Sequence, residues 1–108
     1  MHARALAIAL AWTMAWSAFA QDAGVSERRG AALVAQQCAM CHAVGRFDES
    51  LERQAPPMRT MSRRVPLDRL EGLLGTGLLG GHPVMPKFAF AARDVDAIMR
   101  YLRSIQEP

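Results

Sequence analysis

The sequence has few cysteines, almost no lysine and no strand-like stretch. Cys38 and Cys41 are the only cysteines among 108 residues, so a disulfide could close just one very small loop. Lys87 is the only lysine, and no basic stripe or polybasic patch indicates binding to nucleic acid or to a membrane surface. No segment alternates apolar and polar residues long enough to predict a strand. These shortages predict an all-α chain whose core is not held together by disulfides.

The first twenty residues predict an export signal. The start is weakly basic, residues 5–20 are mostly apolar, and Ala18-Phe19-Ala20 is a small-x-small cleavage site. The alternative is an uncleaved membrane anchor, but this apolar stretch is shorter than the ~20 residues that a spanning helix needs. We therefore expect cleavage after Ala20, with residues 21–108 forming one domain in the periplasm that does not insert into the membrane.

A domain of this size has difficulty stabilising itself. The 88 residues after the predicted cleavage point would bury only somewhat more than ~60% of their unfolded surface. Small domains usually gain the missing stability from disulfides, a metal or a cofactor. With the first option limited to one small loop, we expect a metal or a cofactor to complete the core.

Three segments predict helices, and long loops join them. Residues 26–37 begin with Ser26 as a plausible N-cap, and residues 66–75 begin with a proline and end at a glycine. Residues 94–105 carry apolar side chains at steps of three and four. Long loops are unusual in a compact domain unless they perform the function. Here they suggest segments wrapped around a bulky apolar group.

The stretch Cys38-Ala39-Met40-Cys41-His42 is a C-x-x-C-H motif, the signal for covalent attachment of a c-type haem. Each thiol would add to one vinyl group, and the adjacent histidine would be held as an axial ligand of the iron. A thioredoxin-like pair would need a strand–helix–strand pattern, and structural zinc would need further ligands. A plain disulfide would leave His42 and the long loops unexplained.

A second axial ligand is predicted in the segment GGHPVMPKF, residues 80–88. Met85 lies 43 residues after His42 and precedes a proline that favours an extended backbone, so we predict that its thioether binds the iron. His82 is the rival, because a second imidazole is also a good ligand. The remaining methionines are weaker candidates: Met40, Met58, Met61 and Met99.

Together with the closing helix, these motifs resemble the class I c-type cytochromes, specifically the small bacterial monohaem proteins. The resemblance runs from about Gly30 to Ile105. It implies three main helices and long loops around one covalently bound haem c, with Gly30 crossing the last helix near Ile98 and Tyr101. It also implies a proline carbonyl that accepts the N–H of the axial histidine, for which Pro56 is preferred to Pro57. Arg59 is a candidate partner for a haem propionate.

With His42 and Met85 both bound, the iron would have no open position, which predicts an electron carrier and not an enzyme. Its partners would then be redox proteins, and the protein would be a monomer or one subunit of a redox complex. Two alternatives stay open. In the first, the domain serves as the haem subunit of a periplasmic dehydrogenase or oxidase. In the second, Met85 is a labile ligand, as in a haem sensor or a peroxidase-like protein.

Overall fold

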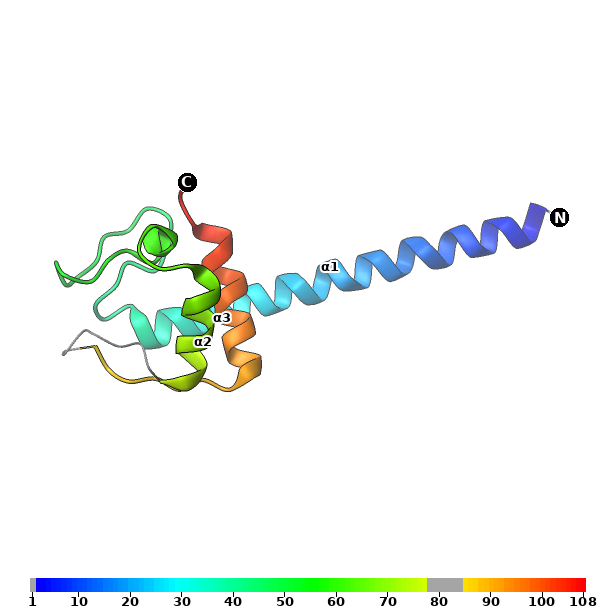
Figure 1. Ribbon diagram of the computed structural model, residues 1–108. Coiled ribbons are helices and arrows are strands. Elements are labelled where there is room, and N and C mark those ends of the chain that lie inside the picture. The colour runs from blue at the N-terminus through cyan, green and yellow to red at the C-terminus, as the bar shows by residue number, and fades with distance from the viewer. Residues whose placement is uncertain (1, 78–84) are drawn as a thin grey trace.

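The computed structural model describes the backbone of residues 2–77 and 85–108, with side chains for residues 19, 21–77 and 85–108 (Figure 1). These ranges contain four helical elements and no strand, which confirms the predicted all-α class. In chain order the elements are α1 (His2–Cys38), the 3₁₀ helix η1 (Met58–Arg63), α2 (Leu67–Thr76) and α3 (Ala92–Ile105).

Helix α1 is much longer than predicted. It runs for 37 residues, so the prediction that a helix begins at Ser26 was wrong. The segment contains no proline, so no residue interrupts the backbone hydrogen bonds of the helix at Ser26. The N-terminal half of α1 extends away from the other elements (Figure 1), and the molecule measures 68 × 29 × 23 Å. No helix in the described ranges is long and apolar enough to cross a bilayer.

Helices α2 and α3 lie close to their predicted positions. Helix α2 follows Pro66 and ends at Thr76. Its C-cap is Gly77, whose φ of 73° is left-handed and suits a glycine, so the predicted cap at Gly75 was two residues early. Helix α3 begins after Ala91 and ends at Ile105, as predicted at its C-terminal end. The side chain of Ala91 makes no capping hydrogen bond, so the first turn of α3 lacks a common source of stability.

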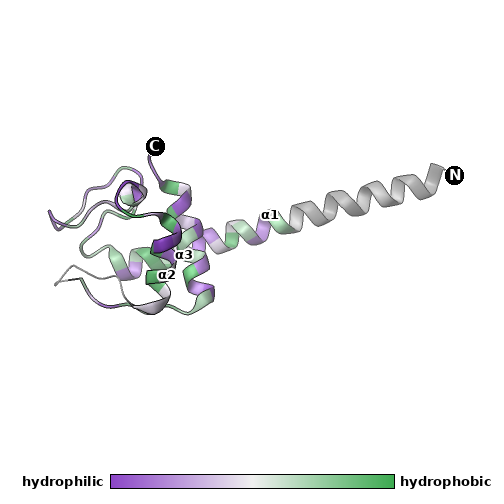
Figure 2. Ribbon diagram, viewed as in Figure 1, coloured by the Kyte–Doolittle hydropathy of each residue, from purple (hydrophilic) through white to green (hydrophobic). Residues whose placement is uncertain are grey.

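The core lies where α1, α2 and α3 meet, with η1 at one side. Helix α3 is amphipathic, and both hydrophobic and hydrophilic residues recur along it (Figure 2). Its apolar stripe faces the other helices, and its charges face solvent. The buried apolar core consists of Val34, Met58, Leu70, Leu74, Val95, Ile98, Met99, Leu102 and Ile105.

The crossing of α1 and α3 is closest at Gly30. A Cβ atom placed on Gly30 would lie 1.8 Å from the carbonyl oxygen of Ala97 and 3.0 Å from the backbone nitrogen of Ile98. This contact confirms the predicted approach of Gly30 to the last helix. The ion pair between Arg29 and Asp94, at 2.6 Å, joins the same two helices beside it.

Candidate functional site

The C-x-x-C-H motif continues α1 by one turn. Cys38 is the last residue of the helix, and its carbonyl oxygen accepts hydrogen bonds from the backbone N–H of Cys41 at 3.2 Å and of His42 at 2.9 Å. Residues three and four positions apart share one side of a helical turn. The two thiols and the imidazole are therefore presented together, while Met40, between the cysteines, is 85% exposed.

The imidazole of His42 has a defined tautomer. His42 is 9% exposed, and the Nδ1 atom of its ring lies 2.7 Å from the carbonyl oxygen of Pro56. A carbonyl can only accept a hydrogen bond, so Nδ1 carries the proton and donates it. The lone pair of His42 is therefore on Nε2, the nitrogen left to bind a metal. Pro56 is the residue at which the sequence analysis expected this acceptor.

The loop that supplies Pro56 is tied back to the motif by backbone hydrogen bonds. The N–H of Glu52 donates to the carbonyl of Cys41 at 3.1 Å, and the N–H of Met58 donates to the carbonyl of Ala43 at 2.9 Å. Just before Glu52 in the sequence, the hydroxyl of Ser50 accepts the N–H of Ala43 at 2.9 Å. Pro56 is therefore held beside His42 by contacts on both sides of it.

Asp48 folds the chain just after His42, and the sequence analysis did not find it. Its carboxylate accepts the backbone N–H of Val44 at 2.9 Å and of Gly45 at 2.8 Å. Desolvation acts to raise the pKa of Asp48, but these hydrogen bonds and the charge of Arg59 leave that pKa below its ordinary value. The hydroxyl of Tyr101 donates to the carbonyl of Val44, which joins this turn to α3.

Both cysteines are free and half-buried. Burial raises the pKa of the Cys38 thiol to about 11, so this thiol stays protonated at neutral pH. A thiol–disulfide exchange site needs the opposite, a lowered pKa that provides thiolate. The part of the chain that the structure describes also holds no group of three His, Cys, Asp or Glu residues arranged to bind a metal ion. This geometry supports neither a thioredoxin-like redox pair nor a structural zinc site at the motif.

The methionines occupy three kinds of position. Met58 and Met99 belong to the core, with 6% and 0% of their surfaces exposed, and Met40 points into solvent. Met61 and Met85 are half-buried, and Met61 packs against the core. His82 lies outside the described residues. Among the described methionines, Met61 and Met85 are thus the two whose burial suits a ligand.

The loop that carries Met85 is anchored next to the end of α2. The N–H of Phe90 donates to the carbonyl of Leu74 at 3.0 Å, and a Cβ on Gly77 would lie 3.3 Å from the carbonyl oxygen of Phe88. The rings of Phe88 and Phe90 stack, with centroids 5.6 Å apart. The residues just before and just after 78–84 in the sequence therefore lie close together in the structure.

The guanidinium of Arg59 forms hydrogen bonds with other groups of the protein. Its Nε donates to the carboxylate of Glu107 at 2.9 Å, and another guanidinium nitrogen donates to the backbone carbonyl of Asp48 at 2.7 Å. The side chain is 17% exposed. Arg59 therefore joins the turn after the motif to the C-terminal segment, a role that the sequence analysis did not predict.

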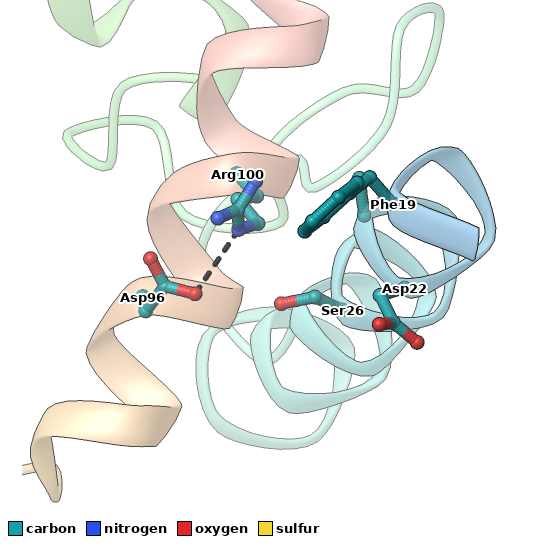
Figure 3. Close-up of a pocket in the computed structure, with 6 residues that line it drawn as sticks. Phe19, Asp22, Ser26, Asp96 and Arg100 are labelled. Atoms are coloured by element: carbon teal, nitrogen blue, oxygen red, sulfur yellow. Dashed lines mark hydrogen bonds and ion pairs between the residues drawn. The ribbon is translucent and has the colours of Figure 1, made fainter. Parts of the chain in front are cut away.

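A groove lies elsewhere, between α1 and α3 (Figure 3). It has a volume of about 430 Å³, and Asp96 and Arg100 form an ion pair of 3.0 Å in its wall. None of the predicted site residues lines it, and Phe19, which does, precedes the predicted cleavage point. We therefore place the functional site at the C-x-x-C-H turn.

The residues at this turn fit a covalently attached iron porphyrin. Two thiols and an imidazole with its Nε2 lone pair free are presented from one turn, which is the donor set that such a group needs. Apolar side chains that pack on the core but stay partly exposed would cover a flat apolar group. They are Leu33, Val44, Met61, Val65, Leu67 and Phe90.

Comparisons with known proteins agree with this chemistry. The family model described as "Cytochrome C oxidase, cbb3-type, subunit III" matches residues 25–102. Cytochrome c-552 of Bradyrhizobium diazoefficiens is 31% identical over 107 residues, which cover 98% of this chain and 97% of the relative. No solved structure matches the chain significantly. The matched range contains the C-x-x-C-H turn, Pro56 and Met85.

Proposed function

Because the chain belongs to the family of cytochrome c oxidase, cbb3-type, subunit III, and is thus a small c-type cytochrome, we propose that it is an electron carrier with one covalent haem c. The family match and the cytochrome c relative indicate electron transfer by haem. The observation that carries the proposal is the His42 ring, which follows the two thiols directly and whose Nδ1 is fixed by Pro56 at 2.7 Å.

Cys38 and Cys41 are proposed to attach the haem. Each S–H would add across one vinyl C=C bond, so that sulfur bonds to one carbon, the hydrogen goes to the other, and a thioether results. A thioether has no ionisable proton. The burial that raises the pKa of the Cys38 thiol therefore creates no charge penalty once the bond has formed.

His42 and Met85 are proposed to hold the iron from opposite sides. The Nδ1–H bond to Pro56 leaves Nε2 of His42 to bind the iron and would make the imidazole a stronger donor to it. When bound, the haem supplies a one-electron Fe(III)/Fe(II) couple. With two side chains as ligands, no coordination position is left for a substrate, which favours electron transfer over catalysis.

We further propose that the chain is exported to the periplasm and cleaved after Ala20. The ion pair of Arg29 and the close approach of Gly30, which join α1 to α3, both lie beyond this point. Removal of the preceding residues would leave these contacts in place, because the N-terminal half of α1 extends away from the other helices (Figure 1). The domain that remains would comprise residues 21–108.

Two measurements on the haem-containing protein test the carrier function: a spectroelectrochemical titration, and exposure of the reduced protein to carbon monoxide. We expect a reversible one-electron transition and no binding of carbon monoxide to the reduced protein at neutral pH. Binding of carbon monoxide under these conditions would show a labile sixth ligand. It would favour the alternative of a haem sensor or a peroxidase-like protein.

A second candidate function is that of an electron-transfer subunit in an oxidase complex. The observation that favours it is the family description itself, which names a subunit of a cbb3-type oxidase. Purification from native membranes under mild conditions separates the two functions. A subunit would copurify with oxidase in fixed proportion, whereas a free carrier would be recovered as a monomer in the periplasmic fraction.

A further inference from the structure

The carboxamide of Gln106 satisfies three hydrogen bonds at the C-terminal end of α3. Its Nε2 donates to the carbonyl of Leu102 and to the carbonyl of Met58, both at 2.8 Å. Its Oε1 accepts the backbone N–H of Ser62 at 2.9 Å. Two donors and one acceptor are what a primary amide offers in this arrangement, and neither a carboxylate nor an alkyl side chain can replace it.

These contacts fix both ends of η1 on the end of α3. Met58 begins η1 and its side chain is buried in the core, while Ser62 lies in its last turn. The backbone of Arg59, the second residue of η1, accepts the N–H of Glu107 at 2.8 Å. The segment that immediately follows Pro56 and Pro57 is therefore held by the C-terminal residues of the chain.

The same segment is bound to the residue next to His42. The N–H of Met58 donates to the carbonyl of Ala43 at 2.9 Å. Met58 lies only two residues after Pro56, whose carbonyl accepts the hydrogen bond from His42. A displacement of the start of η1 would therefore move the acceptor of the imidazole proton. Gln106 is 64 residues from His42 in the sequence and reaches it through Met58 and Pro56.

We propose that Gln106 is a positioning residue that sets the strength of the hydrogen bond from His42 to Pro56, and through it the reduction potential. This inference rests on the proposed function, since it needs His42 as a ligand of the haem iron. A strong hydrogen bond from Nδ1–H makes the imidazole a better donor, which favours ferric iron. Loss of Gln106 would lengthen this bond, favour ferrous iron and raise the potential.

Two variants of the haem-containing full chain test the proposal. Gln106→Ala removes all three hydrogen bonds, whereas Gln106→Glu keeps an acceptor for Ser62 but turns a carboxylate oxygen toward two carbonyls. Arg103→Gln is the matched control, because Arg103 also joins α3 to another element, by pairing with Asp68 at 3.1 Å and Glu71 at 3.0 Å on α2. The readouts are the reduction potential, hydrogen exchange of the His42 Nδ1–H in the reduced protein, and urea unfolding.

Gln106→Ala should raise the potential and both Gln106 variants should speed exchange of the His42 proton, whereas Arg103→Gln should do neither even where it lowers stability. Each upward shift of 59 mV corresponds to a tenfold rise in the Fe(II)/Fe(III) ratio at fixed applied potential. If the Gln106 variants unfold more easily but keep the wild-type potential and proton exchange, Gln106 is merely structural and the proposal is wrong. Should Gln106→Ala fail to fold, exchange of the His42 proton in Gln106→Glu decides alone. A wild-type protein without haem would instead overturn the proposed function.

Discussion

Gly30 and Ala97 bring the backbones of α1 and α3 into direct contact, at a distance that leaves no space for a side chain. A Cβ at position 30 would lie 1.8 Å from the carbonyl oxygen of Ala97, and a backbone atom cannot move aside as a flexible side chain can. The helix that ends in the C-x-x-C-H turn is therefore positioned by this crossing. We expect Gly30→Ala to separate the helices and to lower the free energy of unfolding by about 3 kcal/mol.

Gly72→Ala is the matched control for this prediction. Gly72 lies within α2, and a Cβ there would meet no atom within 4 Å. Alanine is the better helix former, so this change should stabilise the protein by about 1 kcal/mol. Urea unfolding of both variants with haem bound compares them directly. Equal effects of the two substitutions would show that the crossing is not as close as described.

Ala91→Ser should stabilise the protein through the first turn of α3. Ala91 has the extended backbone of an N-cap, with φ −61° and ψ 149°, but its side chain makes no capping hydrogen bond. A serine hydroxyl at this position can accept a free N–H of the first turn, which should add about 1 kcal/mol to the free energy of unfolding. Ala92→Ser, one residue inside the helix, should give no such gain in the same thermal or urea unfolding experiment.

Asp48→Asn should change the response of stability to acid. The pKa of Asp48 is lowered in the folded state from its ordinary value of 3.8, so its carboxylate stabilises the fold above that pH. This contribution is lost as the pH falls below about 3.8 and through the lower folded-state pKa. The variant should therefore be less stable than wild type at neutral pH, and the difference should shrink as the solution is acidified.

Urea unfolding as a function of pH measures the effect of Asp48→Asn. Glu49→Gln removes one negative charge from the neighbouring position and controls for the overall charge. A constant difference between Asp48→Asn and wild type across the acid range would contradict the role given to the hydrogen bonds from Val44 and Gly45.

Three substitutions separate the candidates for the sixth ligand. Met85→Ala should abolish the sulfur-to-iron charge-transfer band of the oxidised protein and lower its reduction potential, because a thioether favours ferrous iron. Met61→Ala is the matched control, since Met61 is also half-buried but packs against the core. His82→Ala tests the rival imidazole. Loss of the band in the Met61 variant, or its absence in wild type, would reject Met85.

The apolar periodicity predicted the three helices that surround the site, and the motif predicted which side chains meet there. The ends of the helices and the structure of the loops were harder to predict from the sequence. Ser26 is a good N-cap residue, yet α1 passes through it because no proline interrupts the preceding residues. The 3₁₀ helix η1 was not predicted, since it depends on hydrogen bonds to Gln106 and Glu107, which are distant in the sequence.

The site shows the same division between local and long-range information. Cys38, Cys41 and His42 are contiguous in the sequence, so their common side follows from helical spacing alone. Asp48 and Gln106 act through backbone groups, which carry no sequence signal, and only the folded chain brings these groups together. Arg59 was expected near a haem propionate from its charge, but its partners in the structure are Glu107 and Asp48.

Intact-mass measurement on the exported protein, produced in a host that matures c-type cytochromes, tests the covalent haem most directly. The polypeptide should begin at Gln21 and should carry the added mass of one haem after denaturation, and replacement of both Cys38 and Cys41 by Ala should abolish this addition. A wild-type chain that shows the mass of the bare polypeptide under these conditions would contradict the account.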